Sequence, residues 1–240
     1  MTTHIAACHI HSEWSYDAQW TLDELAAEFS RQGCEILLMT EHDKGWDQER
    51  WNAYQEACRD ASTDQLFIVP GIEYSDPRNT VHVLVWGSDA FLGEGLETDV
   101  LLQSVKSNDA VAVLAHPERK RAWEAFEPEW FKTVLGVEVW NRKTDGWAPS
   151  LRGIEAWEKH EVVPFAGLDF HRRNQFYPLR MALGLDGVCS EDAVIQALRK
   201  REIAPIYKGR PLIPELKQGG PFGSRPMEKA RRILRRVIPH

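Results

Sequence analysis

Two histidines near the start of the chain, His9 and His11, are the first residues that could do chemistry. They follow an apolar run, Ile5–Cys8, which predicts a short buried strand. Residues two apart on an extended chain point to the same face, so both imidazoles can stand side by side at the end of the strand. Converging neutral imidazoles suit a divalent metal ion. The pair predicts a metal site, although packing is an alternative for so short a motif.

More possible ligands follow at the ends of later apolar runs or within them. They are Glu41, His42 and Asp43, then Glu73, His82 and His116, and finally Asp169 and His171. Glu138 is the weakest member of the series and is not counted as a ligand, since it either orients an imidazole or is a carboxylate at the edge of the core. Six of the nine histidines belong to this series with the first pair, and the rest (His4, His160 and His240) look like surface or edge residues. Any single member could be an ordinary core residue or ion-pair partner. Buried charges need partners, however, and so many ligands indicate two or more ions of Zn, Mn, Fe or Mg.

The bulk composition is that of a soluble globular protein, with 43% hydrophobic and 27% charged residues in 240. The net charge of −7 argues against general nucleic-acid binding, which leaves a nucleotide-type substrate as the exception. No apolar run approaches the roughly 20 residues of a membrane span, and no secretory signal is recognisable. The four cysteines form no CxxC pair and look like reduced thiols. We therefore expect a cytoplasmic protein without membrane contact.

Strands and helices are predicted to alternate. The apolar runs that predict strands are Ile5–Cys8, Glu35–Met39, Leu66–Val69, Val81–Trp86, Ala110–Ala115, Gly136–Trp140 and Val162–Gly167. A first helix is expected after Thr21, which can form a capping box with Glu24, and others near 47–61, 98–107, 121–134, 149–160 and 190–201. The turn at 75–79 predicts a hairpin between the third and fourth strands. This order favours an α/β barrel or a doubly wound sheet, whose functional residues gather at the C-terminal ends of the strands.

The chain from Gly209 onward differs from the rest. It carries eight Lys or Arg against two Glu, and it is rich in Pro and Gly up to Gly223. From Arg225 the apolar residues have helical spacing, at Ala230, Ile233, Leu234 and Val237. We predict a domain over 1–208 and a C-terminal extension over 209–240 whose short basic helix packs on the domain. Contact with nucleic acid or an anionic surface is the alternative for this helix.

Taken together, the motifs resemble those of the PHP (polymerase and histidinol phosphatase) family over residues 1 to about 175. The resemblance rests on His9-x-His11, Asp17, Thr40-Glu41-His42-Asp43, Gly71-Ile72-Glu73, His82, Ala115-His116-Pro117 and Asp169-x-His171. It implies a distorted (β/α)7 TIM-like barrel with up to three metal ions at the C-terminal ends of the strands. Two departures are visible. Members often have Ser-Asp-Gly where this chain has Ser15-Tyr16-Asp17-Ala18-Gln19, and Asp where it has Glu41.

The resemblance also implies a role for each ligand. His9, His11, Glu73 and Asp169 would surround a first ion. Glu73 would bridge to a second ion, which His82 and His116 also hold, and Asp17, His42 and His171 would hold a third. All nine positions carry residue types able to bind metal. We therefore expect a competent enzyme, with Glu73, Asp169 and His171 as its catalytic residues.

The expected reaction is hydrolysis of a small phosphorylated metabolite or nucleotide by a hydroxide that bridges the ions. His171 and His42 are candidate proton donors to the leaving group. Among cations that follow the strands, Arg119, Arg142 and Arg172 are preferred for binding the phosphate. Other such cations are Lys44, Lys120, Lys143 and Arg173, and an exposed surface charge is the alternative for each. Three tryptophans are placed to stack on a base or sugar, namely Trp46, Trp140 and Trp147.

Two other functions stay open. Amidohydrolase barrels use comparable metal clusters, so a non-phosphate bond could be the target, although no strand-borne lysine is available for carboxylation. A non-catalytic accessory module stabilised by its metals is the other alternative, and the complete ligand set speaks against it. The sequence identifies neither the natural substrate nor the oligomeric state.

Overall fold

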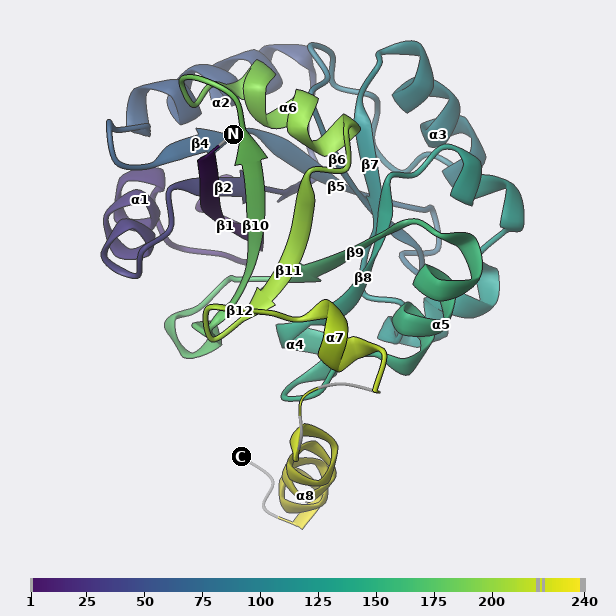
Figure 1. Ribbon diagram of the computed structural model, residues 1–240. Helices are drawn as coiled ribbons and strands as arrows, with labels where there is room; N and C mark the ends of the chain where they lie inside the picture. Colours follow the sequence, from purple (N-terminus) through teal and green to yellow (C-terminus); the bar gives the residue numbers. More distant parts are fainter. Residues whose placement is uncertain (1, 219–220, 222, 238–240) are drawn as a thin grey trace.

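Strands and helices alternate along most of the chain in the computed structural model, which describes residues 2–218, 221 and 223–237, with side chains described as far as Arg231 (Figure 1). The strands are β1 (Thr2–Ile10), β2 (Ile36–Met39), β3 (Glu41–His42), β4 (Phe67–Val69), β5 (Gly71–Ser75), β6 (His82–Trp86), β7 (Val111–Leu114), β8 (Gly136–Asn141), β9 (Val163–Gly167), β10 (Leu179–Leu185), β11 (Ile203–Tyr207) and β12 (Arg210–Pro211). The α-helices are α1 (Leu22–Arg31), α2 (Gln48–Ala61), α3 (Thr98–Ser107), α4 (Arg142–Asp145), α5 (Leu151–His160), α6 (Glu191–Arg199), α7 (Ile213–Leu216) and α8 (Ser224–Val237). Short 3₁₀ helices are η1 (Arg119–Ala125), η2 (Pro128–Lys132) and η3 (Arg173–Gln175).

The strands form two six-stranded sheets, and this mixed α/β architecture confirms the predicted class. The strand order is β12-β11-β10-β1-β2-β4 in one sheet and β3-β5-β6-β7-β8-β9 in the other. The sheets meet where the backbone N–H of Leu168 donates to Cys8 O at 2.9 Å and Ile10 pairs with Phe170. Within the described residues the hydrogen bonds do not close one continuous barrel. The meeting point nevertheless brings the ends of β1 and β9 together.

Each predicted apolar run contains a strand, but the sequence analysis missed several others. β3 and β10 to β12 were not predicted, and a further strand, β5, begins directly after Pro70. The predicted helix over 121–134 is wrong. Lys120 and Arg121 have positive φ angles of 48° and 60°, and Pro128 interrupts the segment, so it forms two short 3₁₀ helices instead.

Two local signals that were recognised in the sequence help to position the site. Thr21 Oγ1 accepts from the backbone N–H of Glu24 at 3.1 Å, and the Glu24 carboxylate accepts from Thr21 N at 3.0 Å, which confirms the capping box. The turn at 75–79 forms a hairpin, but its first strand is the unpredicted β5 and not the predicted strand Leu66–Val69. β5 and β6 are antiparallel neighbours, with Ser75 opposite His82. Because of this pairing, Glu73 and His82 lie on adjacent strands.

The C-terminal helix α8 lies at the bottom of the view in Figure 1. Its Glu228 carboxylate accepts from the backbone N–H of Trp147 at 2.9 Å, in the loop after α4. The division at residue 208 stays a prediction, and the side chains of Ile233, Leu234 and Val237 lie outside the described residues. His240 lies outside them too. Across the described chain, no helix combines the length and apolar character that crossing a membrane requires.

Candidate metal centre

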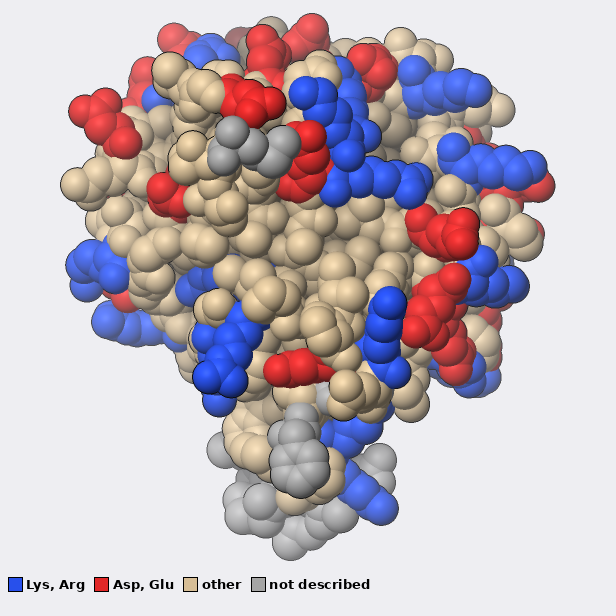
Figure 2. Space-filling model, viewed as in Figure 1, with Lys and Arg blue, Asp and Glu red and all other residues tan. Residues whose placement is uncertain are grey.

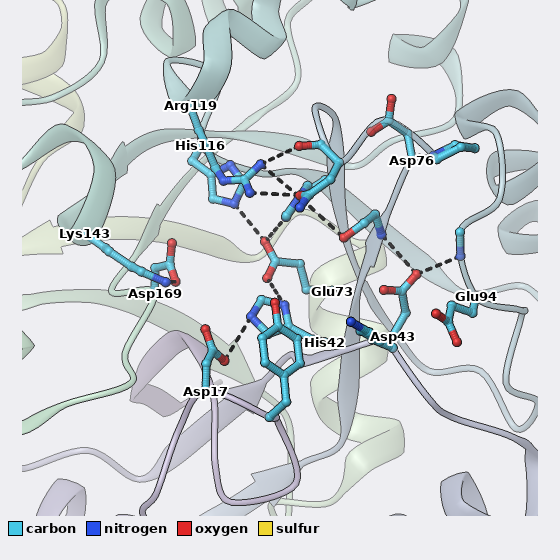
Figure 3. A pocket seen from close by; sticks show the side chains of 17 residues that line it. Asp17, His42, Asp43, Glu73, Asp76, Glu94, His116, Arg119, Lys143 and Asp169 are labelled. Carbon is cyan, nitrogen blue, oxygen red and sulfur yellow. Dashed lines mark hydrogen bonds and ion pairs between the residues drawn. The ribbon is translucent and has the colours of Figure 1, made fainter.

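Glu73, at the centre of the site, is a fully buried carboxylate surrounded by imidazoles (Figure 3). Its two oxygens lie within 3.5 Å of a ring nitrogen of each of five histidines. The distances are 2.7 Å to His82 Nδ1, 2.7 Å to His116 Nε2, 3.0 Å to His42 Nδ1, and 3.5 Å to both His9 Nε2 and His11 Nε2. These histidines come from or follow four different strands, so the fold gathers the predicted series around one carboxylate.

The backbone at the His9–His11 pair is not the regular extended strand that the sequence predicted. His9 has a φ of 61°, and the pairing of β1 with β2 shifts register between Cys8 and Ile10. A bulge therefore replaces the regular alternation expected for an extended chain. The two rings still lie together, with centroids 5.3 Å apart. His116 and Asp169 also have positive φ angles, of 25° and 52°, and such strain often marks functional sites.

The remaining predicted ligands, Asp17, Asp169 and His171, lie next to the imidazoles of His42 and His11. Asp17 Oδ1 lies 3.3 Å from His42 Nε2, and Asp17 Oδ2 lies 3.2 Å from His171 Nε2. Asp169 Oδ1 lies 3.4 Å from His171 Nδ1 and 3.8 Å from His11 Nε2. The structure thus brings all nine predicted ligands together.

Across the described part of the chain, three groups of side chains have ligand atoms within 4.8 Å of one another, a spacing that a shared metal ion requires. They are His11, His42 and His171, then His9, Glu73 and His116, and finally His9, His11 and Asp169. The ring nitrogens His9 Nε2 and His11 Nε2 are buried and have no hydrogen-bond partner among the residues that the structure describes. Buried polar atoms are rarely left without a partner, so these nitrogens fit metal coordination.

Other side chains orient the imidazoles. Glu138 accepts a hydrogen bond from His9 Nδ1 at 2.9 Å and another from the backbone N–H of His116 at 2.7 Å. Of the two roles predicted for Glu138, these contacts support the orientation of an imidazole. A proton on Nδ1 leaves the Nε2 lone pair of His9 directed into the cluster, as metal-binding histidines require.

The sequence analysis did not assign a role to the network that holds His11. Ser15 Oγ donates to Glu41 at 2.5 Å and accepts from the backbone N–H of His42 at 3.0 Å. His11 Nδ1 lies 3.2 Å from the same oxygen, so its Nε2 faces the cluster. Glu41 also accepts from Tyr54 Oη at 3.2 Å. Glu41, at a position where PHP family members often have Asp, thus holds the Ser15 hydroxyl that contacts His11 and the backbone of His42.

Electrostatic coupling in the cluster is strong. Burial alone would raise the pKa of Glu73, but neighbouring imidazoles, His82 and His9 foremost, hold it well below its usual value. Burial opposes charge on His42 as well, yet Asp17 and Glu73 raise its pKa to about 10. The pKa of His11 is lowered, because burial and the nearby His171 and His42 all disfavour its charged form. The cluster therefore combines ionised carboxylates with a neutral imidazole at His11 and a charged one at His42, and metal binding would release the His42 proton.

The three arginines preferred for binding phosphate line two different pockets. Arg119 lines the space beside the cluster that Glu73, His116 and Lys143 also line, called the main pocket below. Its Nη1 atom lies 3.0 Å from His82 Nε2. Lys143, which was not among the preferred cations, also lines this pocket, and its Nζ lies 3.0 Å from Asp169 Oδ1. Arg142 and Arg172 line a neighbouring pocket instead. No local sequence signal distinguishes Lys143 from Arg142.

The predicted stacking role is wrong for two of the three tryptophans. Trp140 is fully buried, and its indole N–H donates to Gly146 O at 3.1 Å. Trp46 is 7% exposed and packs against Trp51 and Tyr54. Both rings are held in the core because apolar neighbours surround them. Trp147 is half-buried, and its stacking role stays a prediction.

No family model matches the chain, and no curated protein matches it. Several solved structures do match the chain. A two-domain protein from Bacteroides vulgatus ATCC 8482 that contains a predicted PHP-like metal-dependent phosphoesterase is 17% identical, with a TM-score of 0.64 over 86% of this chain and 65% of that one. The lesion-specific endonuclease PfuEndoQ from Pyrococcus furiosus is 12% identical, with a TM-score of 0.60 over 83% and 56%. This chain therefore spans less than two thirds of either protein.

An amidohydrolase from Chromobacterium violaceum is also similar, at 14% identity and a TM-score of 0.54 over 85% of this chain and 98% of that one. Identities this low establish the fold alone. The structural similarities agree with the motifs that sequence analysis found. The chain has the α/β fold of these solved structures, which include a protein with a predicted PHP-like metal-dependent phosphoesterase and an amidohydrolase.

Proposed function

We propose that the chain is a metal-dependent phosphoesterase that hydrolyses a small phosphorylated metabolite or nucleotide, and that its strands form a distorted barrel of the PHP type. The convergence of five histidines on the buried Glu73 carries this proposal. Similarity to solved structures that include a predicted phosphoesterase and an endonuclease supports it.

Two or three divalent ions, of Zn, Mn, Fe or Mg, would bind at this cluster. The proposed ligands are His9, His11, Asp17, His42, Glu73, His82, His116, Asp169 and His171. When bound, such ions lower the pKa of a coordinated water and neutralise charge on phosphoryl oxygens. Glu73 would serve two ions at once, because each of its oxygens faces a different set of imidazoles. Asp169 and His171 would complete the catalytic set.

The main pocket suits a phosphate group beside the cluster. It has a volume of about 320 Å³ and is lined by Glu73, His116, Arg119 and Lys143. Arg119 reaches the pocket from the top of the view and Lys143 from its left side (Figure 3). Cations from two directions would hold two phosphoryl oxygens and fix the orientation of the ester for attack.

The direct test is release of phosphate from a chromogenic monoester by the chain saturated with Mn²⁺ or Zn²⁺. Hydrolysis should disappear in Glu73→Gln and in His9→Ala, whereas Glu129→Gln, an exposed acid far outside the pocket lining, should retain it. Activity that persists in both ligand variants would contradict the proposal. Turnover of an amide but of no phosphate ester would favour the amidohydrolase alternative instead.

A further inference from the structure

A second pocket lies beside the main one. Its volume is about 340 Å³, and basic side chains dominate its lining: Arg142, Lys143, Arg172 and Arg231. Asp17, one of the proposed ligands, lines it as well. Asp17 and Lys143 also line the main pocket, so the two spaces share a wall. The shared residues mean that a molecule bound at the metal centre can extend into the basic pocket.

The C-terminal helix supplies one of these cations and holds it in place. Arg231 of α8 contacts the Glu228 carboxylate through Nε at 2.7 Å and through Nη2 at 2.6 Å. Glu228 is 5% exposed and accepts from the backbone N–H of Trp147 at 2.9 Å. The loop approaches so closely that a Cβ on Gly146 would lie 2.3 Å from a Glu228 oxygen. Arg231 is therefore fixed against the loop that follows α4.

The other cations come from separate segments. Arg142 of α4 lies over the ring of Tyr177, with 4.8 Å between its Cζ and the ring centroid. Arg172 lies at the start of η3, next to the proposed ligand His171. Basic side chains of α8 are visible at the bottom of Figure 2. Guanidinium groups from three elements thus line one small space, which favours an anion. Arg231 would donate through the N–H groups that its pairing with Glu228 leaves over.

We propose that α8 completes a subsite for a second anionic group of the substrate, so that the preferred substrate carries a phosphate or carboxylate apart from the ester that is cleaved. The inference rests on the proposed function and specifies its substrate class. Arg231 would act as a specificity residue, since it binds the distal group and lies outside the metal cluster. This gives the basic tail a role within the site in place of contact with a separate polyanion.

The experiment compares alkyl monophosphates with alkanediol bisphosphates and ω-phosphooxy carboxylates of increasing chain length. Arg231→Gln should raise the KM of the preferred dianionic substrate about tenfold more than that of the monophosphate, with the effect in KM and not in kcat. Arg231→Lys should keep part of the preference, because it retains the charge. Preference for the bisphosphate or for the carboxylate identifies the second group.

Lys229→Gln is the matched control, since it removes one positive charge from the same helix at an exposed position outside the pocket lining. It should behave as the unmodified chain. Equal effects of Arg231→Gln on both substrates, or equal effects of Lys229→Gln and Arg231→Gln, would overturn the subsite.

A binding measurement separates this inference from the proposed reaction. Calorimetry with propane-1,3-diol bisphosphate on EDTA-treated chain requires no catalysis. Weakened binding in Arg231→Gln and in Arg172→Gln, but not in Lys229→Gln, would support the subsite even if no ester were hydrolysed. Unchanged binding in both arginine variants would overturn it even if hydrolysis were efficient.

Discussion

Glu73 is the residue on which the centre depends most. A carboxylate that is 1% exposed needs compensating partners, and here the partners are five imidazoles from four segments. Removing its charge would leave those rings facing one another without an anion between them. Residues that orient the imidazoles, such as Glu138, should matter nearly as much, because they fix which ring nitrogen faces the cluster.

Glu138→Gln should therefore lower metal affinity by about 10–100-fold, although Gln is close to Glu in size. A neutral amide loses the charge that favours the Nδ1–H form of His9, and it cannot accept at both atoms that now bind His9 and His116. Competition with a Zn²⁺ indicator measures the affinity. Glu129→Gln provides the control at an exposed site. Equal affinities for both variants and the unmodified chain would contradict this role.

Thiol reactivity provides a second prediction at this scale. Cys8, Cys34 and Cys58 are no more than 2% exposed, and burial raises the pKa of each. Cys189 is only half-buried. Burial raises the pKa of Cys189 as well, so its greater access decides the order, and in the folded chain a thiol reagent should modify Cys189 first. Loss of the fast phase in Cys189→Ser would support this, and a fast phase that survives would contradict it.

At the scale of elements, the loop after α4 connects helix α8 to the site. Gly146 has a φ of 78°, and a Cβ there would meet Glu228 and Arg231 at 2.3 Å and 2.5 Å. Gly209 has a similar φ of 72°, but a Cβ there would meet nothing within 4 Å. Gly146 also has a ψ of −121°, outside the regions that residues with a side chain readily adopt, so backbone strain and contact with α8 both oppose a side chain there.

Gly209→Ala should lower the free energy of unfolding by about 1 kcal/mol, the cost of the φ angle alone. Gly146→Ala should cost more, by roughly 1–3 kcal/mol, because the added methyl also displaces the Glu228–Arg231 pair. Urea unfolding of both variants measures the difference. Equal losses would show that α8 does not pack against this loop in solution.

Which elements could be predicted depended on whether the signal was local. Short apolar runs and the Thr21 capping box carry their own evidence, so most strands and α1 were predicted. Strands β10 and β11 were not, because their place beside β1 is set by pairing between distant segments. The bulge at His9 likewise depends on the register with β2. The segment 121–134 shows a local signal that was overlooked, namely Pro128.

The candidate ligands could be predicted because ligand types at strand ends follow the chain. The supporting contacts could not. Glu138 and His9 are 129 positions apart, and Lys143 and Asp169 are 26 apart. Such pairs depend on how β8 and β9 meet β1, which no local pattern specifies.

For the whole molecule, metal should contribute measurably to stability, since ligands from many segments meet at one cluster. Ion at 100 times its Kd would add about 2.7 kcal/mol to the free energy of unfolding. For a chain of this length that corresponds to a Tm rise of roughly 5–10 °C. Thermal unfolding with EDTA and with excess Zn²⁺ measures the shift. Glu73→Gln should show little of it, and an equal shift in that variant would point to metal bound elsewhere.

The most direct test of the metal centre is the metal content of the purified chain, after saturation with Zn²⁺ or Mn²⁺ and removal of free ions. The proposed centre predicts two or three ions per chain by elemental analysis. Lys229→Gln should match that content, and His9→Ala should fall below it. Less than one ion per correctly folded chain would contradict the account.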